Sequence, residues 1–235
     1  MSPRHAADAT PVPFGDAEAL QILLAEYAAL QKALDLAWTL SQQRTNVFFA
    51  VLSATAVSVG LVVQATGDRA AVVPFTIVVL GLASFVGIAT YVRVVQALQE
   101  ATFAILGMNR IRRHLRDRAP ATAPYFTLPM NDDEASLHRG VGGMYGHGAE
   151  RLSYRYALLH VHGVVAVLSG CLAGSGVAFA VAQIVSAPAV SLAAGVAACV
   201  VVVVVLFRHL HASVSDLRRS WNPVFPASKT GGGTS

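Results

Sequence analysis

Hydrophobic and polar positions divide the chain into four long apolar segments separated by polar stretches. The apolar segments cover residues 47–63, 72–92, 157–184 and 189–207, and none contains Asp, Glu, Lys or Arg. Each is long enough to cross about 30 Å of hydrocarbon as a helix, and a helix satisfies its own backbone groups in lipid. The pattern predicts an all-α membrane protein with four transmembrane helices.

The connections between these segments predict two transmembrane hairpins. The first and second segments are joined by a short turn containing Gly67 and Asp68, and the third and fourth by a short turn before Pro188. We therefore expect the following order: a disordered lead at 1–16, a cytoplasmic amphipathic helix at 17–45, a first hairpin at 46–97, a cytoplasmic extension of the second span at 98–118, a cytoplasmic linker at 119–155, a second hairpin at 156–208 and a cytoplasmic tail at 209–235.

Two of the predicted helices reach beyond the membrane. Residues 17–45 carry an apolar stripe at helical spacing, formed by Leu20, Leu23, Tyr27, Leu30 and Leu34. No Gly or Pro separates this helix from the first span, so the two can be continuous. A helix from Phe75 to Arg118 would measure about 66 Å, roughly twice the hydrocarbon thickness. The sequence leaves open whether it is straight or bends at Gly107.

Composition and charge agree with a membrane location and predict its orientation. The chain is 54% hydrophobic and 13% charged, whereas soluble domains carry about 25% charged residues. Of the 17 Lys and Arg residues, only Arg69 lies in the two short turns. The positive-inside rule therefore places both termini and the linker in the cytoplasm.

Two surfaces offer contacts for other helices. The stripe on residues 17–45 packs against the extension of the second span as an antiparallel pair, or forms an oligomer seam or partner-docking face, and both can hold together. The third span has small residues at steps of four, namely Ala166, Gly170, Gly174, Ala178 and Ala182. Such a groove lets a helix approach closely, from either the same subunit or a second one.

A basic cluster marks the end of the long second helix, at Arg110, Arg112, Arg113, Arg116 and Arg118. Nucleic-acid binding is disfavoured because no aromatic platform accompanies the arginines. Lipid contact is disfavoured because a straight helix puts them about 25–40 Å beyond the bilayer, past a Debye length of about 8 Å. The cluster reads as a solvated helix tip, with docking of an acidic segment as the alternative, including the chain's own "NDDE" at 131–134.

No catalytic constellation emerges from the sequence, and we expect no enzyme activity, cofactor or metal. His160 and His162, like His209 and His211, are two residues apart and point to opposite sides of a helix, so neither pair can chelate alone. The acidic and histidine residues of the linker lack recognised ligand spacing. We interpret Cys171 and Cys199 as small apolar residues that pack within the spans, with a disulfide bridge between spans or a reactive thiol as alternatives.

The stretch "NRIRRHLRDRAPATAPYF", together with an amino-terminal helix reading roughly "EYAAL…Q…R", resembles a loose family of small bacterial four-span integral membrane proteins. The resemblance implies the four-span topology and a bacterial inner-membrane location, and it supplies no catalytic residues. The first hairpin with its helices is also similar in outline to two-span effector domains of bacterial defence systems, which is an analogy of fold alone.

These observations favour a non-catalytic, multi-span inner-membrane protein with a cytoplasmic helical platform for self-association or partner docking. The expected partners are membrane lipid, further copies of the chain and a protein bound at the cytoplasmic helices, with no nucleic acid. The alternative is an oligomeric membrane effector or pore gated through those helices, lined by hydroxyl side chains of the spans.

Overall fold

The computed structural model describes residues 15–66, 69–133, 136 and 161–226. These residues are mainly helical and contain no strand. The elements are α1 (Asp16–Thr66), α2 (Arg69–Arg118), the 3₁₀ helix η1 (Pro120–Tyr125), α5 (Val161–Ala182) and α6 (Pro188–Ser220). All four α-helices are long and apolar enough to cross a membrane, which confirms the prediction of an all-helical chain with four apolar helices.

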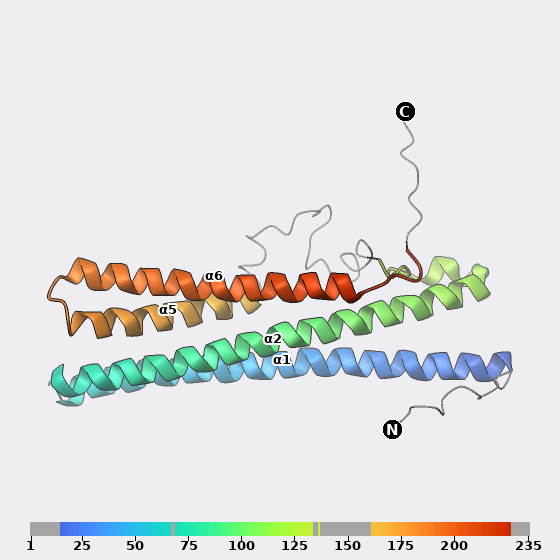
Figure 1. The fold of residues 1–235 in the computed structure, drawn as a ribbon. Helices are drawn as coiled ribbons and strands as arrows, with labels where there is room; N and C mark the ends of the chain where they lie inside the picture. The colour runs from blue at the N-terminus through green and yellow to red at the C-terminus, as the bar shows by residue number, and fades with distance from the viewer. Residues whose placement is uncertain (1–14, 67–68, 134–135, 137–160, 227–235) are drawn as a thin grey trace, which may run out of the picture.

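The helices α1 and α2 are each one continuous element and lie side by side along their lengths (Figure 1). They contain 51 and 50 residues, which makes each about 75 Å long. The helix α2 runs through Gly107 without interruption. A Cβ atom at Gly107 would lie only 2.9 Å from Cδ1 of Leu30, so glycine here allows α1 and α2 to pack closely.

The second pair of helices differs in length from the expectation. The helix α5 ends at Ala182 and is followed by a turn, two residues before the predicted end of the third apolar segment, whereas residues 157–160 lie outside the described residues. The helix α6 continues through Ser220, well beyond residue 207. Its continuation keeps Leu210 buried and Val214 half-buried, so packing against the other helices extends it.

The helix α2 occupies the centre of the structure, because it packs against α1 on one side and against α5 and α6 on the other. A shared core includes Phe48 of α1, Tyr91 of α2 and Val165 of α5, all with essentially no exposed surface. Two hydrogen bonds join the helices across this core. Oη of Tyr91 donates to the carbonyl of Leu206 at 2.8 Å, and Oγ of Ser84 donates to the carbonyl of Ser169 at 3.1 Å.

The outward faces of the apolar segments are exposed rather than covered by protein. Val57, Leu82, Phe85 and Val201 each expose 60–67% of their surface. A soluble protein of this size rarely leaves so much contiguous apolar surface in water. Exposure of this kind along four long helices is expected where lipid chains cover the surface.

Candidate functional site at the C-terminal end of α2

A densely connected polar cluster lies near the C-terminal end of α2, where Asp132 is completely buried. Its Oδ2 accepts a bond from Nε of Arg110 at 2.7 Å. The backbone N–H of Val224 donates to Oδ2, and the N–H of Phe225 donates to Oδ1, both at 2.8 Å. The backbone of Asp132 takes part as well, because its carbonyl accepts from Nε1 of Trp221 at 2.7 Å. We call these five residues the clasp.

The clasp joins three segments that are far apart in the sequence: the end of α2, the stretch around Asp132 and the stretch that follows α6. The guanidinium of Arg110 lies 4.2 Å from the centre of the Trp221 ring and donates to the carbonyl of Asn222 at 2.9 Å. The Trp221 ring also packs against Phe103 of α2, with ring centres 6.1 Å apart. The end of α6 is therefore fastened to α2 through both charge and aromatic contact.

The carboxyl group of Asp132 is stabilised in its charged form. Burial by itself would raise the pKa of Asp132, but the hydrogen bonds from Val224 N–H, Arg110 and Phe225 N–H outweigh burial and hold the pKa below its usual value. The three described groups that hydrogen-bond to this carboxylate are all donors, so ionised aspartate suits the position.

The other arginines of the predicted basic tip also have partners. Arg112 is buried and donates to Oη of Tyr27 in α1 at 2.7 Å and to Oδ1 of Asn109 at 2.9 Å. Arg118 pairs with Asp16, the first residue of α1, at 2.5 Å. The end of α2 is thus bound to α1 at two points.

The remaining two arginines share Asp117 as an acceptor. Nε of Arg113 lies 2.9 Å from Oδ2, and Nη2 of Arg116 lies 2.8 Å from Oδ1. Hydrogen bonds from Arg116 and Arg113 hold the pKa of Asp117 below its usual value. Arg113 also donates to Oδ1 of Asn131 at 3.1 Å. The tip therefore holds parts of its own chain, including Asp132 of the "NDDE" stretch that the sequence suggested as an acidic target.

The predicted apolar stripe of residues 17–45 faces α2 along most of its length. Leu23, Tyr27, Leu30 and Leu34 are half-buried against that helix, whereas Leu20 is 43% exposed. Packing within the chain therefore occupies this seam, as the antiparallel alternative predicted. Partner docking through it remains a separate prediction.

The small-residue stripe of α5 packs on α6 within the same chain. A Cβ atom on Gly174 would lie 2.5 Å from the carbonyl oxygen of Gly195, and one on Gly170 would lie 3.0 Å from the carbonyl oxygen of Cys199. Ala166 is fully buried, and the Ala178 side chain lies beside Gly195. Ala182 is exposed and stands outside this contact.

The candidate metal ligands and the two cysteines form less extensive clusters than the clasp. Within the described residues, no group of three His, Cys, Asp or Glu side chains lies close enough to hold a metal ion, and Glu134, His138 and His147 of the linker lie outside them. The thiols of Cys171 and Cys199 are free, and their sulfur atoms are 3.9 Å apart across α5 and α6.

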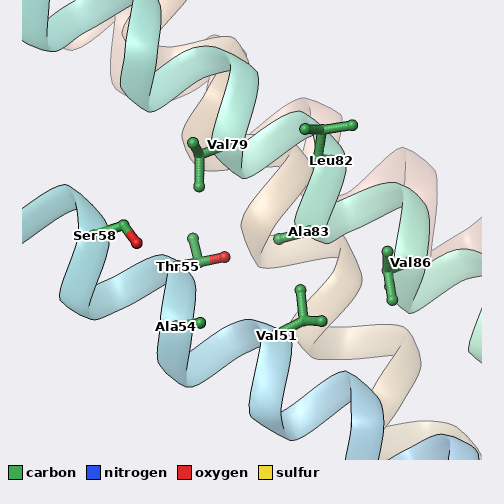
Figure 2. Close-up of a pocket in the computed structure, with 8 residues that line it drawn as sticks. All are labelled: Val51, Ala54, Thr55, Ser58, Val79, Leu82, Ala83 and Val86. Carbon is green, nitrogen blue, oxygen red and sulfur yellow. The ribbon is translucent and has the colours of Figure 1, made fainter.

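A groove of about 250 Å³ lies between α1 and α2 in their apolar halves (Figure 2). Its lining residues are Val51, Ala54, Thr55, Ser58, Val79, Leu82, Ala83 and Val86. The small side chains Ala54 and Ala83 leave the space, and only two hydroxyl groups give it polarity. A groove of this size is smaller than ordinary ligand pockets of about 300–1,000 Å³ and contains no ionisable group.

The sequence indicates Asp132 as part of the "NDDE" stretch, both as a target for the arginine tip and among the linker residues that lack metal-ligand spacing, but it does not single out Trp221. The one local signal was "WNPVFP" at 221–226, an aromatic and proline-rich stretch directly after a helix. Comparisons of the chain with protein-family models, with curated proteins and with solved structures find no match.

Proposed function

We propose that the chain is a non-catalytic, multi-span protein of the bacterial inner membrane that presents a cytoplasmic helical platform for protein association. In this proposal, the two helix pairs are transmembrane hairpins with both termini and the linker inside. The charge distribution supports this orientation, because Arg69 alone among 17 Lys and Arg residues lies in a short turn. The bacterial location rests on the resemblance of the sequence to small four-span proteins.

The platform consists of the halves of α1 and α2 that extend past their apolar segments. From Asp16 to Arg44, α1 continues for about 40 Å. The clasp and the Arg112 and Arg118 contacts bind this part of α1, the end of α2 and the end of α6 to one another. Such a structure can present a surface with a defined shape to another protein.

The observation that carries the proposal is the uncovered outer face of α1. Six apolar side chains are exposed on the cytoplasmic half of α1, on a face that does not contact α2, and we call them the outer stripe: Ile22, Ala25, Ala29, Ala33, Leu36 and Leu40. Ile22 is 50% exposed and Leu36 56% exposed. A stripe of apolar side chains of this length that is exposed to water is typical of a helix that binds a protein partner.

The arginine tip supports the same conclusion, because its side chains already have partners within the chain. Each of its five arginines is paired within the chain, so binding to nucleic acid or lipid phosphate would have to break these contacts. The apolar face of α1 requires no such rearrangement.

Site-specific photocrosslinking in intact membranes tests the proposal. A photoreactive residue at Leu36 should give a protein adduct, whereas one at Gln31, on a different face of the exposed helix, should give much less. Absence of adducts at both positions would contradict association through α1. Selective ion conductance by the purified chain in liposomes would instead favour the pore.

A further inference from the structure

We propose that the partner of the outer stripe is the outer stripe of a second copy, bound as a parallel dimer about a two-fold axis along the membrane normal. This inference rests on the proposed function, because it requires the outer stripe to be an association surface. It adds the identity of the occupant and the direction in which the two α1 helices run.

The spacing of the outer stripe suits a helix–helix seam. Its six residues follow one another at steps of three and four positions, which places them within a sector of about 80° at 3.6 residues per turn. Ala25, Ala29 and Ala33 recur every four residues and permit close approach of a second helix. Leu36 and Leu40 then supply larger apolar side chains for burial.

Charges on the flanks of the outer stripe favour a second copy in the parallel direction. Glu26 and Lys32 are exposed and lie on opposite flanks of the stripe. A two-fold rotation about an axis parallel to the helices brings each flank of one copy against the opposite flank of the other. The Glu26 flank then adjoins the Lys32 flank of the second copy, with the two residues six positions, or about 9 Å, apart along the axis, and their opposite charges favour this direction.

The course of the stripe also suits a membrane-inserted partner. Past the exposed Gln43, the same sector of α1 reaches Val47, which is 59% exposed in the first apolar segment. Beside a soluble partner, lipid chains would cover this continuation. A second copy inserted in the same orientation presents identical residues at identical depths, so its α1 can follow the stripe from water into lipid.

Cysteine crosslinking of the full-length chain tests the geometry. In a Cys171→Ala/Cys199→Ala background, Ala29→Cys or Leu36→Cys should form a disulfide-linked dimer in membranes treated with copper–phenanthroline. Gln31→Cys, exposed on a different face, should not. Equal crosslinking at all three positions would overturn the proposed seam, because it would indicate random collision.

A charge substitution gives a second, matched test. Leu36→Glu should weaken dimerisation in nanodiscs by roughly 10- to 100-fold, since it removes a buried leucine from each copy. Leu24→Glu introduces the same charge at an equally exposed leucine outside the stripe and should leave the dimer unchanged. Equal effects of the two variants would contradict the seam.

The outcomes separate this inference from the proposed function. A monomeric chain whose Leu36 position crosslinks to a different protein would overturn the second copy as occupant and leave the platform intact. A monomeric chain without protein adducts at Leu36 would overturn both. Self-adducts confined to Ala29 and Leu36 would support both.

Discussion

Arg110 in α2 and Asp132 form an ion pair of 2.7 Å in which the aspartate has no exposed surface. The arginine is 34% exposed in its side chain, so the pair lies at the edge of the structure with its acidic partner inside. Two backbone N–H groups from the stretch after α6 complete the shell of the carboxylate. The pair therefore fixes the position of the stretch that follows α6.

Replacing this carboxylate with an amide should release the stretch after α6. In Asp132→Asn, the amide NH₂ would face groups that are themselves donors, and the charge-assisted bond to Arg110 would be lost. We expect a local destabilisation of about 1–3 kcal/mol, measured as faster proteolysis near Trp221. Asp216→Asn, at an exposed aspartate 3.8 Å from Arg219, is the matched control and should retain the wild-type cleavage rate.

The clasp should open in acid and be insensitive to pH near neutrality. The pKa of Asp132 is lowered in the folded chain, so its stabilisation is fully present above the unfolded pKa of about 3.9 and is lost as pH falls through the folded pKa. Trp221 fluorescence in a Trp38→Phe background should stay constant from pH 8 to 5 and change below about pH 4. A midpoint near pH 6 would indicate histidine titration instead.

The glycine contact between α5 and α6 should tolerate no added methyl group. In Gly174→Ala, the new Cβ would meet the backbone oxygen of Gly195, and the helices would have to separate. We expect a loss of about 1–3 kcal/mol, seen as a lower melting temperature in detergent. Gly81→Ala is the control, since nothing lies within 4 Å of its added Cβ. Equal melting temperatures for the two variants would contradict the packing of α5 on α6.

The register of α5 and α6 can be tested with the native thiols. The sulfur atoms of Cys171 and Cys199 are 3.9 Å apart, and a disulfide requires about 2.05 Å. Formation of the disulfide therefore requires the two sulfur atoms to move closer. Copper–phenanthroline should remove both maleimide-reactive thiols from the monomer band, and the Cys171→Ala variant should keep its remaining thiol. Persistence of both wild-type thiols would argue against this register.

The proposed topology makes a prediction independent of the clasp. Reporter fusions at Gly67 and Pro188 should indicate the outside, and fusions at Pro129 and Gly231 the cytoplasm, because positive charges flank the latter side. Reversed signals would overturn the orientation and place the platform outside the cell.

The sequence predicted the helices well where composition alone determines structure. Apolar segments in lipid must form helices, and the absence of Gly and Pro between Ala17 and Val47 allowed α1 to be continuous. The prediction stopped the fourth helix at residue 207 because only apolar length was considered. Leu210, Val214 and Leu217 continue the helical spacing, and this weaker amphipathic signal marked the extension.

The clasp could not be predicted because its members are distant and lack a periodic signal. Asp132 and Phe225 are 93 positions apart in the chain, and neither lies in a helix or strand. A buried aspartate also contradicts the usual expectation for an acidic residue in a linker. The sequence did offer an acidic stretch as a partner of the arginine tip, since excess positive charge favours such a contact.

The unbroken length of α2 gives it the properties of a lever arm. Arg110 lies about 60 Å along the helix from Arg69. A change of about 5° in tilt, pivoting at the Arg69 end, would carry Arg110 sideways by roughly 5 Å. Helices alter their tilt when bilayer thickness changes. A change in bilayer thickness would therefore move the clasp sideways through the tilt of α2.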